Sequence, residues 1–160
     1  MEQKEINIEN PKLLFLKHEF VPLLSRLKPD QKGSWGVMNA QEMVEHFTES
    51  VRIASGVIKL PISNEGEKLA KFREFLMTET PFKENTKNPI LPETAIPAKH
   101  SLMESSIAEL QNELDHFFEV NESHPNMTTD NPFFGALTFE QNIQLLHKHA
   151  KHHLKQFGIE

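Results

Sequence analysis

The residues of this chain with the clearest chemical potential are the histidines near its C-terminal end. Four of the nine histidines, His147, His149, His152 and His153, lie in the run LLHKHAKHHLKQFG. His149 and His153 are spaced i, i+4, which places two imidazoles one turn apart on the same side of a helix. Two such nitrogens can bind one metal ion, as in helical zinc sites. The alternative is a pair of boundary histidines that meet water.

A helical wheel distinguishes the four histidines from one another. At about 100° per residue, His153 lies roughly 60° from the centre of the apolar stripe, and His149 lies further round on the same flank. His152 points away from the core, so we predict a solvated surface histidine there, and His147 lies on the other flank. Ala150 stands where the motif H-E-x-x-H has its glutamate, which argues against a zincin-type protease.

A further candidate ligand, His46, lies far upstream on a second predicted helix. It shares the predicted inner face of that helix with Met43, Phe47 and Ala54. Taken alone, it indicates a core histidine satisfied by hydrogen bonds, since a buried imidazole needs a partner. Taken with the C-terminal pair, it predicts a three-histidine site across two helices, which is how helix bundles bind metals. Surface or helix-end positions account for the remaining histidines: His18, His100, His116 and His124.

The composition limits the class of protein. A chain of 160 residues is expected to form one domain, residues 1–160, around one core. The formal net charge of −6 argues against a nucleic-acid-binding surface. The chain has no cysteine, which excludes disulfides, thiolate zinc sites and cysteine nucleophiles, and no tyrosine that could act in catalysis. The polar N-terminus and the absence of a long apolar run predict a cytoplasmic protein without signal peptide or membrane span.

Helical periodicity dominates the chain and predicts four amphipathic helices. The first begins at Asn10–Pro11, an N-cap followed by proline at the first helical position, and Pro22 is expected to bend it. The second begins with a capping box formed by Asn39 and Glu42. No stretch shows a convincing strand pattern. An all-α fold of the four-helix-bundle type is therefore expected.

The two later helices are also predicted from their capping residues. The third is expected to begin at Ser101, with Glu104 completing a capping box, and to end at His124–Pro125. The fourth begins at Thr138, with Gln141 in the reciprocal capping position. Both carry apolar residues at helical spacing, as a bundle requires.

Residues 57–99 interrupt the helical pattern with five prolines. A short helix around Glu67 to Met77 is expected within an otherwise irregular segment. The segment would form a long proline-rich crossover between the second and third helices. Long loops of this kind often form a pocket wall or a lid.

Two longer motifs carry a resemblance to a known family. The first is WGVMNAQEMVEH, from Trp35 to His46, and the second is HAKHHLKQ, from His149 to Gln156. They are similar to a tryptophan, turn, helix start, glutamate and histidine pattern and to an H-x-x-H-H-x-x-Q pattern. In this order and separation they resemble the DinB/YfiT-like superfamily of metal-dependent enzymes. The stretches PFFGALT and LKQFG resemble one uncharacterised branch of it, and the match covers most of the chain from Trp35 onward.

The resemblance implies an antiparallel four-helix bundle, and a homodimer, with a divalent ion of nickel, zinc or iron. The ligands that it implies are His46 from the second helix and His149 and His153 from the fourth. The better-known relatives are thiol-dependent transferases and isomerases. The implied function is thus an S-transferase or a hydrolase that acts on a small-molecule substrate, with a low-molecular-weight thiol as partner and without nucleic acid or membrane.

Several other side chains have two interpretations each. Glu42 either contacts the ligand histidine one turn later or serves only in its capping box, while Glu45 is expected to face solvent. Gln156 either orients a ligand histidine or a metal-bound group, or is a surface amide. Trp35 and Phe133–Phe134 either line a pocket or pack in the core. The alternative function is a non-catalytic bundle that binds a small ligand or a partner, and a purely structural homodimer is the third.

Overall fold

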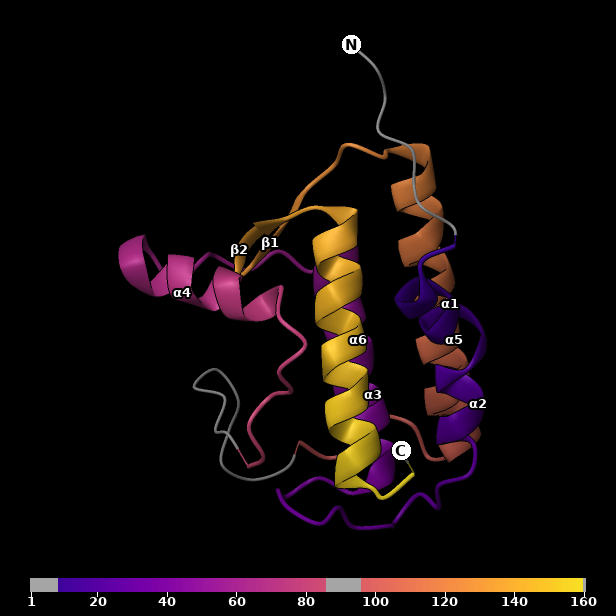
Figure 1. Cartoon of the computed structure of the whole chain (residues 1–160). Coiled ribbons are helices and arrows are strands. Elements are labelled where there is room, and N and C mark those ends of the chain that lie inside the picture. The colour runs from indigo at the N-terminus through magenta and orange to yellow at the C-terminus, as the bar shows by residue number, and fades with distance from the viewer. Residues whose placement is uncertain (1–8, 86–95, 160) are drawn as a thin grey trace.

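The computed structural model describes residues 9–85 and 96–159, which are mostly helical (Figure 1). They contain six helices: α1 (Pro11–His18), α2 (Phe20–Leu24), α3 (Ala40–Ser55), α4 (Gly66–Leu76), α5 (Met103–Ser123) and α6 (Phe139–Gln156). They also contain one antiparallel pair of strands: β1 (Thr129–Asn131) and β2 (Gly135–Leu137). The mainly helical fold is as predicted. The small sheet is not, because three residues a strand are too few to show alternation in the sequence.

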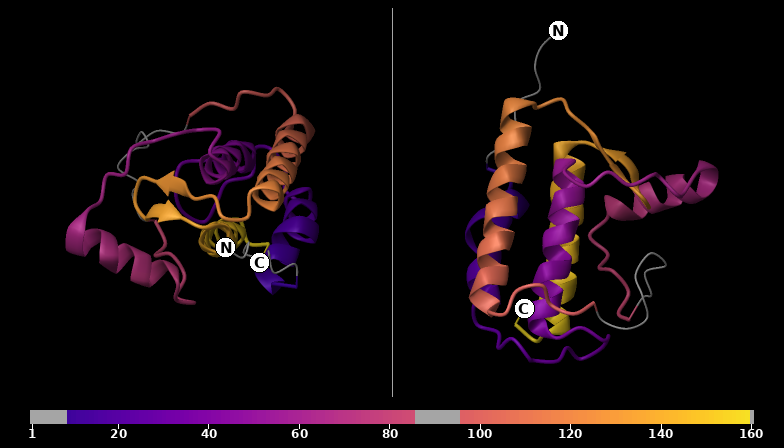
Figure 2. Two further views of the ribbon diagram at one scale, coloured as in Figure 1. Left: turned by 90° about the horizontal axis from the view of Figure 1, so that it is seen from above. Right: turned by 180° about the vertical axis from the view of Figure 1, so that it is seen from behind.

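The long helices α3, α5 and α6 lie side by side along the molecule, and α1 and α2 pack beside α6 and α5, respectively (Figures 1 and 2). The main apolar core lies between these elements. Its largest fully buried side chains include Phe20, Phe47 and Phe117. Each such side chain contributes roughly 1.5–3 kcal/mol through removal of apolar surface from water, so this core fixes α3 against its neighbours.

The N-terminal helical segment is divided into two helices. α1 begins as predicted, with Asn10 Oδ1 accepting a hydrogen bond of 2.9 Å from the Lys12 backbone N–H. It ends at His18, and α2 begins two residues later. The reason is Pro22, which has no N–H to donate to the carbonyl of His18 and whose ring crowds that carbonyl. The predicted bend is therefore a break four residues before the proline.

The capping boxes of α3 and α6 are confirmed. Asn39 N donates to Glu42 Oε1 at 2.8 Å while Glu42 N donates to Asn39 Oδ1 at 2.8 Å. Thr138 and Gln141 form the same reciprocal pair at the start of α6, at 3.0 and 3.3 Å. These two helices carry the three candidate ligands, so both ligand-bearing helices have fixed starting points.

The predicted start of α5 is wrong. The helix begins at Met103 after Leu102, and no side chain of its own caps it. The carboxylate of Glu45, on α3, instead accepts hydrogen bonds from the backbone N–H groups of Lys99 (2.6 Å) and His100 (3.2 Å). Glu45 is half-buried rather than solvent-facing, because it supplies acceptors to the chain that enters α5.

The segment between α3 and α5 contains α4, as predicted, and α4 extends to one side of the long helices (Figure 1). Arg73 joins it to the strand pair by donating to the carbonyls of Phe134 (2.7 Å) and Ala136 (2.8 Å). Phe134 is buried in a second, smaller apolar cluster with Leu76 and Leu137, which makes it a packing residue there. The part of the predicted crossover at residues 86–95 lies outside the described residues.

Within the described ranges, no helix has both the length and the apolar character that a membrane span requires.

Candidate metal centre

The structure brings His46, His149 and His153 together between α3 and α6. The Nε2 atom of His149 lies 3.2 Å from that of His46 and 2.7 Å from that of His153. One ligand atom of each of the three residues lies within 4.8 Å of the others, as a metal-binding group requires. These are the three residues that the sequence predicts as ligands, from segments about a hundred positions apart.

Helix geometry explains how the three rings meet. One turn of α6 separates His149 from His153, and their ring centroids are 4.5 Å apart. His46 approaches them from α3 with its ring nearly perpendicular to both, at centroid distances of 5.1 and 5.3 Å. The buried ring of Phe47, the next residue on α3, packs against His149 at 4.9 Å. The apolar core thus holds the ligand-bearing faces of the two helices against each other.

Burial keeps the three imidazoles neutral. His153 is buried, and His46 and His149 are partly exposed. Loss of hydration of the charged form lowers the pKa of His46 to about 4 and that of His153 to about 3, and repulsion between the clustered imidazoliums acts in the same direction. The same causes lower the pKa of His149 well below its usual value. Neutral imidazole is the form that binds a metal ion.

Gln156 determines which nitrogen of His153 carries the proton. Its Nε2 lies 2.8 Å from the carbonyl oxygen of Trp35, which can only accept, so this atom must be the amide nitrogen. Its Oε1 then lies 2.7 Å from His153 Nδ1 and must accept a hydrogen bond from it. We therefore assign the Nδ1–H tautomer to His153, which leaves a lone pair on its Nε2. Gln156 is buried, so the surface-amide interpretation is wrong, and its side chain contacts the candidate ligand His153.

The arrangement of the three nitrogens fits a shared metal ion better than it fits hydrogen bonding alone. With a lone pair on His153 Nε2, His149 Nε2 would have to carry a proton to complete the 2.7 Å contact. It could then accept nothing from His46 Nε2, 3.2 Å away. At the usual zinc–nitrogen distance of about 2.0–2.1 Å, neighbouring ligand nitrogens lie about 2.9 Å apart in octahedral and about 3.4 Å apart in tetrahedral geometry. A cation between the three lone pairs would resolve the mismatch.

His152 and His147 do not belong to the ligand group. The prediction of a solvated surface position for His152 is wrong, because the residue is half-buried. Its ring contacts those of Trp35 (centroid distance 5.5 Å), Phe82 (6.1 Å) and His153 (5.3 Å). Burial is the main reason why its pKa is lowered. His147 packs edge-on against Phe15 at 5.3 Å, on another flank of α6, as the helical wheel predicts.

The other residues near the three histidines differ in what they contact. Glu42 uses its carboxylate in the capping box of α3, as the simpler interpretation has it. Trp35 contacts two residues that lie beside the three histidines: its ring packs against His152, and its backbone carbonyl accepts a hydrogen bond from Gln156. Phe133–Phe134 pack in the second apolar cluster.

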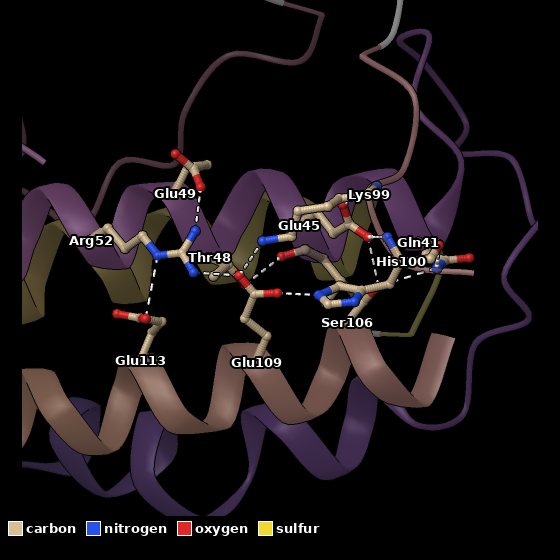
Figure 3. A network of polar contacts seen from close by, with 11 residues as sticks. Gln41, Glu45, Thr48, Glu49, Arg52, Lys99, His100, Ser106, Glu109 and Glu113 are labelled. Carbon is tan, nitrogen blue, oxygen red and sulfur yellow. Dashed lines mark hydrogen bonds and ion pairs between the residues drawn. The ribbon is translucent and has the colours of Figure 1, made fainter. Parts of the chain in front are cut away.

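Sequence reasoning missed a second polar group, on the other side of α3 (Figure 3). Arg52 forms ion pairs with Glu49, Glu109 and Glu113, at 2.6 Å to Glu49 and 3.3 Å to Glu113. His100 also contacts Glu109. The i, i+4 spacing of Glu109 and Glu113 is visible in the sequence, but it does not reveal that α5 places them opposite Arg52.

Comparison of the chain with protein-family models, with curated proteins and with solved structures gave no match.

Proposed function

We propose that this protein is a metal-dependent enzyme of the DinB/YfiT type, built as an antiparallel four-helix bundle. His46, His149 and His153 would hold a divalent ion of zinc, nickel or iron, for which three neutral nitrogen ligands are suited. The proposed reaction is thiol S-transfer or hydrolysis of a small-molecule substrate. We further propose that the protein acts in the cytoplasm as a homodimer.

The observation that carries this proposal is the convergence of three Nε2 atoms from two helices. Clustered neutral histidines with depressed pKa values are costly to assemble, since each loses hydration and none gains an ion-pair partner from the others. Groups of this kind are typical of metal and catalytic sites. The motif resemblance independently selects the same three residues.

Several residues of the chain would support a metal ion bound at this site. When bound, a divalent ion would supply the Lewis acidity that makes water or a thiol nucleophilic near neutral pH. Gln156 holds His153 through its Nδ1–H, and Phe47 covers one side of the His149 ring. His46 and His149 retain exposed surface, so a substrate would approach the centre from their side.

Elemental analysis of protein purified without an affinity tag tests the metal. We expect about one zinc, nickel or iron ion per chain in the wild type and nearly none in the His46→Ala, His153→Ala double variant. His147→Ala is the matched control, because it removes a histidine of α6 that contacts Phe15 and lies outside the ligand group. Nearly metal-free wild-type protein, after growth and dialysis with each ion, would contradict the proposal.

Turnover with a thiol and an electrophile tests the enzymatic part. The rate should require metal, and it should disappear in the double variant while His147→Ala retains it. Dependence on added thiol would indicate S-transfer, and product formation from water alone would indicate hydrolysis.

A non-catalytic metal- or ligand-binding module is the second candidate. It is favoured by the nature of two groups in contact with the ligand imidazoles, the amide of Gln156 and the ring of Phe47, neither of which can act as a general base. Metal-loaded protein that binds a thiol without turning over any electrophile would support it.

A further inference from the structure

The turn that precedes α3 is built around the side chain of Gln156, at the end of α6. Ser34 N donates to the backbone carbonyl of Gln156 at 2.8 Å, and the Trp35 backbone carbonyl accepts from the side-chain Nε2 of Gln156 at 2.8 Å. A Cβ atom at position 33 would lie 2.7 Å from Gln156 Cγ, and one at position 36 would lie 2.9 Å from Gln156 Nε2. Glycine at both places therefore lets the backbone approach this amide more closely than other residues would.

Gly36 has a second reason to be glycine. Its φ of +81° lies in the left-handed region, which residues with a Cβ rarely adopt. That conformation occurs in the turn that presents the Trp35 carbonyl to Gln156. Position 36 thus requires glycine for its backbone conformation, and positions 33 and 36 both require it because the buried side chain of Gln156 lies so close.

The two hydrogen bonds of the Gln156 side-chain amide allow only one orientation of the amide. The Trp35 carbonyl accepts, so the amide nitrogen points toward it and the amide oxygen points toward His153. Rotation of the amide by 180° would place its oxygen against the Trp35 carbonyl, and two acceptors that face each other in a buried site are unfavourable. The backbone of residues 33–36 therefore fixes the amide, and the amide fixes the imidazole.

We propose that Gln156 is the positioning residue of the centre. Held by the turn at residues 33–36, it keeps His153 in the Nδ1–H tautomer and directs the Nε2 lone pair toward His46 and His149. The part of this inference that concerns metal affinity rests on the proposed function. The part that concerns the tautomer is a property of the metal-free protein and can be measured separately.

The test uses nitrogen-15 NMR of the histidine side chains in the metal-free full-length protein, where long-range correlations distinguish Nδ1–H from Nε2–H. We expect His153 as the Nδ1–H tautomer in the wild type. Gln156→Leu removes the acceptor at nearly constant size and should shift His153 toward Nε2–H. Gln156→Glu loses the donor to the Trp35 carbonyl and should lower the stability of the fold, but it retains an acceptor for Nδ1–H and should therefore keep the wild-type tautomer.

Metal affinity provides the second measurement, by competition of a chromogenic chelator for zinc. Loss of an outer hydrogen-bond partner typically weakens metal binding 10–100-fold, and we expect about this loss for Gln156→Leu and a smaller one for Gln156→Glu. Gln31→Leu is the matched control. It removes another glutamine that bonds the same end of the chain, through Nε2 to the Phe157 carbonyl at 3.3 Å, and it should change neither tautomer nor affinity.

Gly33→Ala perturbs the position of the Gln156 side chain without altering Gln156 itself. The new Cβ would displace the Gln156 side chain and should shift the tautomer of His153 in the direction seen for Gln156→Leu. A folded Gln156→Leu protein, with the wild-type circular dichroism spectrum, unchanged His153 tautomer and unchanged zinc affinity, would overturn the inference. A wild type that binds no metal but shows the expected tautomer shifts would contradict the proposed function and leave the positioning role of Gln156 supported.

Discussion

The two sides of α3 carry polar groups of opposite kinds. His46 faces α6, where its imidazole meets two others, and Glu45, the residue before it, faces α5 and the chain that enters it. On the α5 side, Arg52 is matched by three carboxylates (Figure 3). On the α6 side, three neutral nitrogens converge on one another. On the α5 side the protein's own carboxylates neutralise Arg52, whereas on the α6 side the three imidazole lone pairs are available to a cation.

The pKa values show the same difference. On the α5 side, burial opposes ionisation of Glu109, but hydrogen bonds from His100, Lys99 and Arg52 prevail and lower its pKa to about 2. The hydrogen bonds that Arg52 donates to Glu109 and Glu49 likewise raise the pKa of Arg52 against the effect of burial. On the α6 side, burial prevails and favours the neutral form. Ion pairing therefore stabilises charge on one side, and desolvation removes it on the other.

The largest expected effect is the pH dependence of stability in metal-free protein. The pKa of His46 is about 4 and that of His153 about 3 in the fold, against an ordinary histidine value of 6.5, so the unfolded chain binds protons first as the pH falls. The contribution of the two histidines to stability is therefore fully present above about pH 6.5 and is lost as the pH falls to about 3–4. The expected loss is on the order of 3 kcal/mol for each of the two histidines, measured by urea unfolding from pH 7 to pH 4.

A His46→Gln, His153→Gln variant should show a shallower decline over this range. Part of the slope should remain, because burial also lowers the pKa of His147 to about 4 and that of His149 well below its usual value. Glu109 acts in a different window: its contribution is present above about pH 4.5 and is lost as the pH falls to about 2. An equally steep decline between pH 6.5 and 4.5 in the variant would mean that His46 and His153 are not its source.

The second effect is stabilisation by metal. An ion that binds only the folded state stabilises it by about 2.7 kcal/mol at a free concentration a hundred times the Kd. We expect zinc to raise the midpoint of thermal unfolding of the wild type and to leave that of His149→Ala unchanged, because this variant lacks the central nitrogen of the three. A shift of equal size in the variant would assign the zinc to another site.

The sequence predicts the candidate ligands well because they depend on local geometry. The i, i+4 spacing of His149 and His153 places them on one face of any helix, and the capping boxes at Asn39 and Thr138 locate the starts of both ligand-bearing helices. What remained was the pairing of His46 with α6. The apolar stripe shared by Met43 and its neighbours predicts an inward orientation for His46, and the way in which helix bundles bind metals predicts its pairing with the two histidines of α6.

The errors concern contacts between elements that lie far apart in the sequence. Ser101 and Glu104 have the spacing of a capping box, but Glu45 from α3 already supplies acceptors at that end of α5. His152 lies on the outer side of an isolated α6, and it is covered by Trp35, from the turn before α3, and by Phe82, from the long crossover. A helical wheel treats one helix at a time, so it assigns solvent to every position that its own helix does not cover.

The third effect separates the two sides of α3 by mutation. Glu109→Gln keeps the size of the side chain but leaves Arg52, Lys99 and His100 without their shared carboxylate. We expect a loss of about 1–2 kcal/mol in the free energy of unfolding, less than for a fully buried pair because Glu49 and Glu113 still contact Arg52. Zinc affinity should stay at the wild-type value. A weaker affinity in the folded variant would show that the two sides are coupled through α3.

The smallest effect is expected at the outer edge of the α5 side. Glu49 pairs with Arg52 at 2.6 Å, but its side chain is 54% exposed, compared with 18% for Glu109. Solvent screens an exposed pair, so Glu49→Gln should cost less than about 0.5 kcal/mol, and 1 M salt should remove most of this cost. Urea unfolding of Glu49→Gln and Glu109→Gln at low and high salt measures the difference. Equal losses for the two variants would mean that exposure does not weaken the Glu49–Arg52 pair relative to the Glu109–Arg52 pair.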